Sequence, residues 1–115
     1  MSTTKQILNN AINLISKGWC QNVSALKADN TKTTFDSNEA VCFCAMGAIA
    51  RSAHDLHGTD WKQHYGETLN IVTTWFTKNK GKYNTTANSI QQLNDTTNKA
   101  IISQVLRDCL FYTIC

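Results

Sequence analysis

Apolar residues recur along the chain at the spacing of amphipathic helices. Over residues 3–17 they lie three, four and seven positions apart, and Gly18 follows as a residue that commonly ends a helix. A second stretch, over 36–58, opens with acidic residues at capping-box spacing and is apolar on nearly every side over 40–50. A helix of that kind is buried on several sides, so we predict that this second stretch forms the central helix.

Further helical patterns follow in the second half of the chain. In chain order they are a stretch over 59–78 that Gly66 interrupts, one short turn at 90–93, and a last helix that Thr96 or Thr97 caps. Residues 19–35 lack a helical period and have room for one short extended segment before a polar turn at 29–34. We therefore predict an all-α fold, a single compact domain over residues 1–115 with four to five helices and at most one short extended segment.

The composition narrows the class of protein. A chain of 115 residues suits one domain and is long enough to bury a core. It has no run of about 18 apolar residues, as a transmembrane helix needs, and no apolar stretch of about 7–15 residues near its start, as a signal peptide needs. We therefore expect a cytoplasmic protein with no membrane partner, whose 5 cysteines are free thiols and not a disulfide framework.

The charge and the codon bias of the chain bear on its partners and its origin. The net charge of +3 is far below that of a dedicated duplex-DNA-binding protein. Asn, Lys and Ile, whose codons are rich in A and T, supply 30 of the 115 residues, and Pro is absent. This bias favours the product of a bacteriophage or a mobile element.

Three motifs, taken together, resemble those of a known family. They are Gly-Trp-Cys-Gln at 18–21 with Ala-Leu at 25–26, Ala-Val-Cys-Phe-Cys-Ala-Met-Gly-Ala-Ile at 40–49, and Leu-Asn-Asp at 93–95 with Val-Leu at 105–106. This combination is similar to domain-of-unknown-function family 6197, although Phe43 and Leu93 stand where that family usually has Trp. The resemblance implies a single compact domain and no established activity. It singles out Trp19, Cys44, Gly47, Asn94 and Asp95.

Cys44 is a candidate nucleophile. A reactive cysteine needs a helix N-terminus or an adjacent base that lowers its pKa. The predicted helix places Cys44 about two turns from its start, where the helix dipole no longer lowers the pKa of a thiol. The base would then be His57 or His64 from the following segment, and Asn94 or Asp95 would orient that histidine. In the alternative interpretation, the thiol is buried at a tight helix crossing beside Gly47, and Asp95 only fixes a turn.

The cysteines and histidines do not predict a metal site. No CxxC pair is present, and Cys42 and Cys44, two positions apart on the predicted helix, would point in different directions. Cys20 and the histidines add no recognised ligand spacing, although His54 and His57 would share a helix face. We predict neither a bound metal nor a cofactor.

One short segment combines positive charge with aromatic rings. Lys78, Lys80 and Lys82 alternate between Trp75 and Tyr83. Such a pattern can bind phosphate groups and stack on bases. We expect these five residues to form the site for a small phosphate-bearing, nucleotide-like ligand. The alternative is a solvated loop whose lysines complement the negative end of the preceding helix.

These expectations combine into a small cytoplasmic binding protein. It would act as a phage or mobile-element accessory factor that inhibits a host protein or binds a nucleotide-like ligand. The alternative is a cysteine-dependent hydrolase or transferase built on Cys44, His57 and Asp95. The positions of these three residues in the fold distinguish the two hypotheses.

Overall fold

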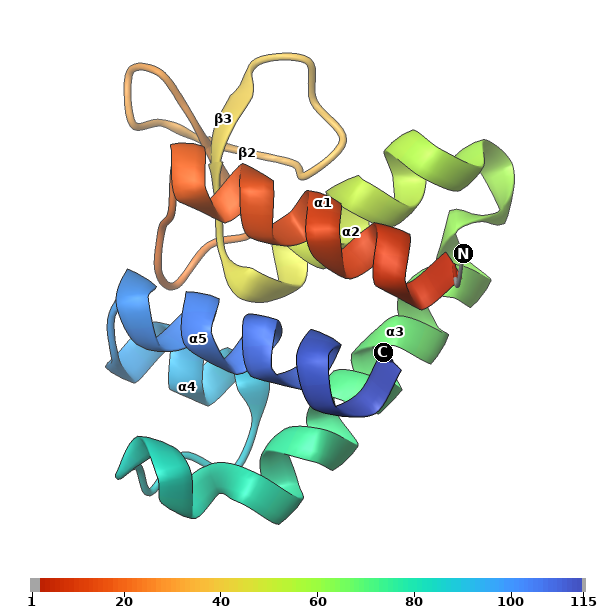
Figure 1. Ribbon diagram of the computed structural model, residues 1–115. Helices are drawn as coiled ribbons and strands as arrows, with labels where there is room; N and C mark the ends of the chain where they lie inside the picture. Colours follow the sequence, from red (N-terminus) through yellow and green to blue (C-terminus); the bar gives the residue numbers. More distant parts are fainter. Residues whose placement is uncertain (1–2, 115) are drawn as a thin grey trace.

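The chain folds into five α-helices and one small antiparallel sheet over residues 3–114, which the computed structural model describes (Figure 1). The helices are α1 (Thr3–Lys17), α2 (Ala45–His57), α3 (Trp61–Asn79), α4 (Ile90–Thr96) and α5 (Lys99–Cys109). The strands are β1 (Ala25–Lys27), β2 (Lys32–Thr33) and β3 (Ala40–Phe43). Two short 3-10 helices, η1 (Gly58–Asp60) and η2 (Lys80–Tyr83), flank α3, and a π-helical segment, η3 (Leu110–Ile114), follows α5. Cys115, one of the cysteines counted in the sequence, lies outside the described residues.

The second helix is the centre of the fold, as the apolar run predicted. α2 packs against α1, α3 and α4. Its residues Ala45, Ala48 and Ile49 are fully buried, and their mostly small side chains let the neighbouring helices approach closely. Ser52 in α2 also donates a hydrogen bond from its Oγ to the backbone carbonyl of Ile7 in α1, 2.7 Å away. This bond satisfies a buried hydroxyl group and ties the two helices together.

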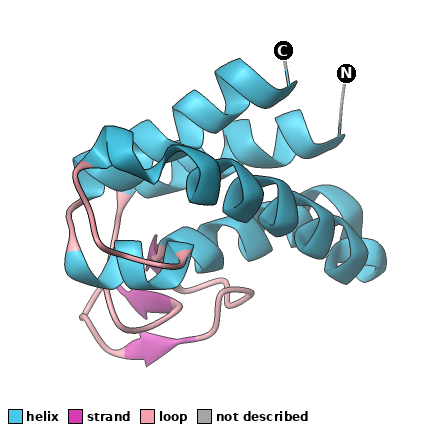
Figure 2. Cartoon of the chain, turned by 90° about the horizontal axis from the view of Figure 1, so that it is seen from below, coloured by secondary structure: helices cyan, strands magenta, loops and turns pink. Residues whose placement is uncertain are grey.

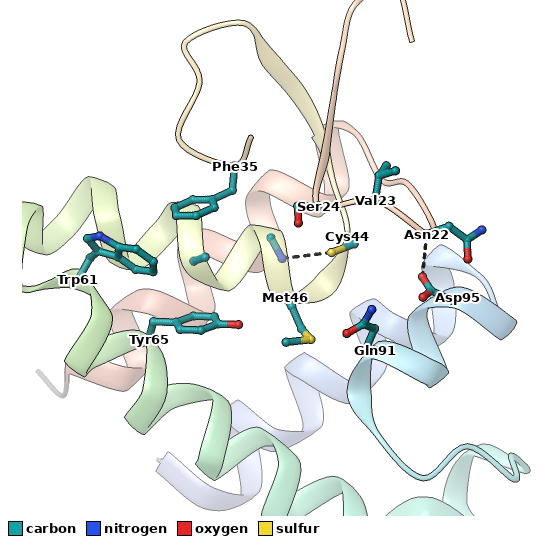
Figure 3. A pocket seen from close by; sticks show the side chains of 12 residues that line it. Asn22, Val23, Ser24, Phe35, Cys44, Met46, Trp61, Tyr65, Gln91 and Asp95 are labelled. Carbon is teal, nitrogen blue, oxygen red and sulfur yellow. Dashed lines mark hydrogen bonds between the residues drawn. The ribbon is translucent and has the colours of Figure 1, made fainter. Parts of the chain in front are cut away.

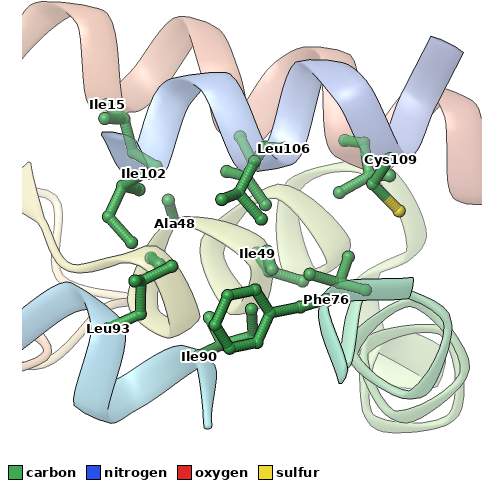
Figure 4. Close-up of a cluster of buried hydrophobic side chains, with 14 of the residues drawn as sticks. Ile15, Ala48, Ile49, Phe76, Ile90, Leu93, Ile102, Leu106 and Cys109 are labelled. Carbon is green, nitrogen blue, oxygen red and sulfur yellow. The ribbon is translucent and has the colours of Figure 1, made fainter. Parts of the chain in front are cut away.

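Every helix contributes at least one large side chain to the hydrophobic core (Figure 4). Ile15, Ile49, Phe76, Leu93 and Leu106 come from α1 to α5 in that order, and none is more than 1% exposed. Burying a side chain of this size contributes about 1.5–3 kcal/mol. α1 and α5 lie side by side over α2, with α4 on the other side of the cluster (Figures 1 and 4). The core is therefore complete only when all five helices are docked.

The all-α prediction is wrong in one respect, because it omits the sheet. The fold is mostly helical, and the sheet covers one end of the helical body (Figure 2). β1 is the middle strand and pairs antiparallel with both neighbours, so that Ala25 stands opposite Thr33 of β2 and Phe43 of β3. The sequence left room for an extended segment near β1. Its partner β3, however, lies inside the apolar run that was assigned to the central helix.

The central helix accordingly begins at Ala45 and not near Asp36. The acidic residues do not cap it, and Glu39 instead forms an ion pair with Lys27 of β1 at 3.3 Å. A short apolar run fits a strand as well as a helix, so its period alone does not decide between them. Residues 40–43 form a strand because they pair with β1.

Gly66 does not interrupt the third helix, which is continuous from Trp61 to Asn79. A glycine inside a helix costs only about 1 kcal/mol relative to alanine. The burial of Val72, Trp75 and Phe76 on one face of α3 outweighs that cost. Within residues 3–114, no helix combines the length and the apolar character needed to cross a membrane.

The last two helices begin at side-chain caps other than the predicted threonines. Ser89 Oγ accepts a hydrogen bond from the backbone N–H of Gln92 at 3.0 Å and starts α4. Asn98 Oδ1 accepts from the N–H of Ile101 at 3.0 Å and starts α5. Threonine was predicted as the cap of the last helix, but asparagine is at least as good a cap.

Candidate functional site

Asn94 joins three segments of the chain at the start of α2. Its side chain is completely buried. The Oδ1 atom accepts hydrogen bonds from Trp19 Nε1 at 2.7 Å and from the N–H of Ala45 at 2.9 Å. The Nδ2 atom donates to the carbonyl of Cys20 and to Asp95 Oδ1, both at 3.1 Å. Every hydrogen-bonding position of the amide is therefore used, and the loop after α1, the first turn of α2 and α4 are held together.

Gly47 allows the segment before β1 to lie directly on the first turn of α2. A Cβ atom at this position would stand 2.2 Å from the carbonyl oxygen of Ser24. The same oxygen accepts a hydrogen bond from the N–H of Cys44 at 3.2 Å. The close neighbour that explains Gly47 is therefore a backbone carbonyl, and not a crossing helix as the sequence suggested.

A pocket of about 320 Å³ opens beside these contacts (Figure 3). We call it the α2 pocket, because Cys44, Met46, Gly47 and Ala50 from the start of α2 line it. The other lining residues are Asn22, Val23, Ser24, Phe35, Trp61, Tyr65, Gln91 and Asp95. Figure 3 shows aromatic side chains on one side of Met46 and polar side chains on the other.

The aromatic wall is a packed cluster. The ring centroids of Phe35 and Trp61 lie 4.9 Å apart, and those of Trp61 and Tyr65 lie 5.8 Å apart. His54 contacts both Phe35 and Trp61 edge-on, with centroids 6.3 Å away in each case. Arg51 holds the loop that carries Phe35, because its Nη1 donates to the carbonyl of Phe35 at 3.0 Å. The wall is thus fixed from two sides, by packing and by a charged hydrogen bond.

The polar wall comes from α4 and from the loop before β1. Asp95 Oδ1 accepts a hydrogen bond from the backbone N–H of Asn22 at 2.8 Å, in addition to the one from Asn94. Gln21 donates from Nε2 to the carbonyls of Asn94 and Thr97, at 3.1 and 3.0 Å. These bonds fix the loop against α4 and orient one oxygen of the Asp95 carboxylate.

Cys44 is the N-cap residue of α2, which corrects its predicted position two turns inside the helix. Its Sγ accepts a hydrogen bond from the N–H of Gly47 at 3.2 Å. Burial raises the pKa of the Cys44 thiol above its ordinary value, and hydrogen bonds from the backbone of Gly47 and Met46 oppose this only in part. At neutral pH the thiol is protonated, so it is not poised as a nucleophile.

The structure brings Cys44 and Asp95 to the same pocket, but it does not bring His57 there. His57 lies at the other end of α2, thirteen positions from Cys44, which is about 20 Å along a helix. It stacks on His64 of α3 with ring centroids 3.9 Å apart. None of the described residues lining the α2 pocket is a histidine.

Cys42 and Cys44 do not lie inside a helix, although we expected this when we argued that they could not share a metal ion. Cys42 lies in β3, and Cys44 follows that strand directly. All four cysteines within residues 3–114 are free. In this part of the chain, no group of three or more His, Cys, Asp or Glu side chains is arranged to hold a metal ion.

The lysine-rich segment lies elsewhere, at the end of α3 and in η2. Lys82 Nζ stands over the rings of Trp75 and Tyr112, at 5.7 and 4.7 Å from their centroids. Lys80 Nζ donates to Asn88 Oδ1 at 3.0 Å. Lys78 lines a separate hollow of about 500 Å³, together with Trp75 and Tyr112.

Tyr83 belongs to the support of this segment and not to its free surface. Its hydroxyl donates a hydrogen bond to Asp108 Oδ2 at 2.7 Å. Its ring lies 6.0 Å from that of Trp75, which is itself only 9% exposed. Of the five predicted site residues, Lys78 and Trp75 therefore line one hollow, and Lys82 lies over the rings of Trp75 and Tyr112. Lys80 and Tyr83 have partners of their own.

Sequence reasoning missed the aromatic wall of the α2 pocket. Trp61 and Tyr65 are four positions apart, a spacing that puts them on one face of a helix and that was available as a signal. Phe35 joins them from a loop without periodic pattern, and Gln91 comes from α4. No local signal in the sequence connects these two residues to the motif around Cys44.

Comparison with known proteins identifies one match. The model of a family described as "Family of unknown function (DUF6197)" matches residues 1–110. No curated protein and no solved structure matches the chain. The match spans all the residues that line the α2 pocket.

Proposed function

The chain belongs to DUF6197, a family of unknown function, and we propose that it is a binding protein that holds a small organic molecule in the α2 pocket. The observation that carries the proposal is the pocket itself, about 320 Å³ between an aromatic wall and a polar wall. Ligand sites in proteins are typically concave, about 300–1,000 Å³, largely apolar, and equipped with a few polar groups that fix orientation. The α2 pocket has each of these properties.

The pocket walls are held in place before any ligand arrives. Asn94 fixes α4 against the start of α2, and Arg51 fixes the loop that carries Phe35. A site whose walls are already ordered loses little conformational entropy when it binds. This preorganisation favours a role in recognition.

Binding has better support than nucleophilic catalysis. The thiol of Cys44 has a raised pKa, and it lacks a histidine neighbour among the described residues that line the pocket. General bases in cysteine enzymes lie within hydrogen-bonding reach of the thiol. In the proposed role, Cys44 caps α2 and forms part of the pocket floor.

We propose that the protein works in the cytoplasm. Its four described cysteines are free, although Cys42 and Cys44 are only partly buried. Thiols of that kind persist in compartments that keep them reduced.

The test uses indole as a neutral aromatic probe and the tryptophan side chains as reporters. The chain has 3 tryptophans, so its nitrogen-15 spectrum has three indole N–H signals. Titration with indole should shift the Trp61 signal most, because only Trp61 lines the pocket. The Trp75 signal serves as an internal control, since that ring lies in the core beside Lys82.

Two variants test whether indole binds in the α2 pocket. Trp61→Ala should abolish saturable binding of indole. Tyr112→Ala removes a ring that is 63% exposed and lies outside the pocket, so it should leave binding unchanged. Equal binding by both variants, or a response centred on Trp75, would contradict the proposal.

A second candidate function rests on the surface formed by Lys78, Lys82, Trp75 and Tyr112. We propose that this surface binds a phosphate-bearing ligand or an acidic patch of a host protein, because Lys78 lines one hollow with the rings of Trp75 and Tyr112, and Lys82 lies over both rings. Titration with adenosine monophosphate should shift Trp75, and replacing Lys78, Lys80 and Lys82 by Gln should remove that shift. If the shift survives the triple replacement, the lysines are only a solvated surface.

A further inference from the structure

We infer that the molecule bound in the α2 pocket is a small amine that carries its positive charge next to an aromatic or apolar group. The inference rests on the proposed function, because it specifies the ligand of the same site. Two features of the pocket favour a cation independently. One is an uncompensated carboxylate in the polar wall, and the other is the aromatic wall that faces it.

The carboxylate is that of Asp95. Among the described residues that line the pocket, Asp95 carries the one acidic side chain, and none is a lysine or an arginine. Its Oδ1 already accepts hydrogen bonds from Asn22 and Asn94, whereas its Oδ2 has no hydrogen-bond partner within the described part of the chain. An ionised carboxylate oxygen only accepts hydrogen bonds, so a ligand that completes this site must present a donor.

No cation within residues 3–114 supplies that donor. The ion pairs within residues 3–114 join Lys27 to Glu39 and Arg51 to Asp55, and neither includes Asp95. Arg51 is the nearest cation along α2, but its guanidinium also donates to the carbonyls of Phe35 and Ser37, at 3.0 and 2.8 Å. The negative charge of Asp95 is therefore left for the ligand.

The aromatic wall favours the same class of ligand. The faces of Trp61, Tyr65 and Phe35 carry negative electrostatic potential and attract a cation placed over them. A charged amine therefore gains from both walls, and its apolar part replaces water against Met46 and the rings. An anion such as phosphate would be opposed by Asp95 and by the ring faces, so we assign phosphate-bearing ligands to the lysine surface and not to this pocket.

The start of α2 acts against a cation, but weakly. A helix N-terminus carries a partial charge of only about half an elementary charge, against the full charge of Asp95. Its first N–H groups are also engaged, since Ala45 donates to Asn94 Oδ1 and Gly47 donates to Cys44 Sγ. The local balance of charge in the pocket is therefore negative.

The test compares three probes of the same shape and different charge: benzylamine, benzyl alcohol and benzoate. The full chain is labelled with carbon-13 at its methionine methyl groups. It has 2 methionines, Met1 and Met46, and the latter lines the pocket. Dissociation constants are read from the Met46 methyl signal at pH 7, at low and at high salt.

We expect benzylamine to bind about tenfold more tightly than benzyl alcohol, since a hydrogen bond to a charged group is worth roughly that factor or more. Benzoate should bind most weakly, and added salt should weaken only benzylamine appreciably. Asp95→Asn keeps an oxygen for Asn22 and Asn94 but removes the charge, so it should bring benzylamine to within about threefold of benzyl alcohol. Glu67→Gln removes one charge from an exposed site on α3 and should leave the tenfold preference intact.

The outcomes separate the inference from the proposed function. Equal binding of benzylamine and benzyl alcohol to the wild-type protein would overturn the inference while supporting a pocket for small organic molecules. A Met46 signal that responds to none of the three probes would overturn both. If Asp95→Asn fails to fold, the order of the three probes and the effect of salt on the wild-type protein decide the matter.

Discussion

Replacing Asn94 by leucine tests whether this side chain holds the pocket together. Leucine has a similar size but makes no hydrogen bonds, so Asn94→Leu leaves the N–H of Ala45 and the carbonyl of Cys20 without partners in the interior. It also leaves Trp19 Nε1 without a partner, although that residue is only half-buried and water can reach it.

The magnitude follows from the groups left unpaired. Each buried donor or acceptor without a partner costs about 1–3 kcal/mol. Two buried groups and one that water can reach therefore give a loss of about 3–5 kcal/mol in the free energy of unfolding. Since small domains have only about 5–15 kcal/mol in total, this single change consumes a large share of the stability.

Urea denaturation followed by tryptophan fluorescence measures the loss. Asn70→Leu changes an exposed asparagine on α3 in the same way and should alter stability by less than about 0.5 kcal/mol. If Asn94→Leu is too unstable to measure, Trp19→Phe removes one of the four hydrogen bonds and should cost about 1 kcal/mol. A loss below about 1 kcal/mol for Asn94→Leu would refute the reasoning, because it would mean that the four bonds do not hold the segments.

Three further predictions concern single residues. Gly47→Ala should lose about 1–3 kcal/mol of stability, because its Cβ would overlap the carbonyl of Ser24, whereas Gly66→Ala, with open space around it, should gain about 0.5–1 kcal/mol. Iodoacetamide should alkylate Cys44 slowly at pH 7 and faster as the pH rises, because burial raises the pKa of its thiol. Burial, together with the hydrogen bond to Asp108, raises the pKa of Tyr83, so the wild-type protein should lose stability above about pH 10 more steeply than Tyr83→Phe.

Each of these predictions has a result that would count against it. If Gly47→Ala and Gly66→Ala change the free energy of unfolding equally in urea denaturation, the carbonyl of Ser24 moves aside at little cost. Complete labelling of Cys44 within minutes at pH 7, seen by intact mass, would restore the nucleophile hypothesis. The Tyr83 phenol ionises more readily in the unfolded chain than in the folded protein. Stability must therefore fall as the pH rises through the pKa that the tyrosine has in the unfolded chain. Parallel pH curves for wild type and Tyr83→Phe would exclude that contribution.

The helices could be predicted where a local apolar period coincided with burial. Residues 3–17 and the centre of α2 satisfy this condition, and both are helical and buried. Residues 40–43 carry an equally apolar run, but their pairing with β1 depends on a contact about fifteen residues away in the sequence. Such a partner has no local signal, so the start of α2 and the existence of the sheet were not predictable from period alone.

The candidate site was predictable in part. The motifs around Trp19, Cys44 and Asn94 were visible in the sequence, and the structure joins them through one buried amide. The aromatic wall was not visible as a site, because Phe35 and Trp61 meet only when the loop after β2 folds over α3. Chemistry that depends on such long-range packing has to be taken from the fold.

The central claim is that the α2 pocket binds a small amine, and contacts between bound benzylamine and the protein test it most directly. The measurement is the set of intermolecular nuclear Overhauser effects between the ligand and protein carrying labelled methionine and aromatic side chains. The account predicts effects from the benzyl ring to the Met46 methyl group and to Tyr65, all lost in Trp61→Ala. Effects confined to Tyr112 and Trp75, or none at saturating benzylamine, would contradict it.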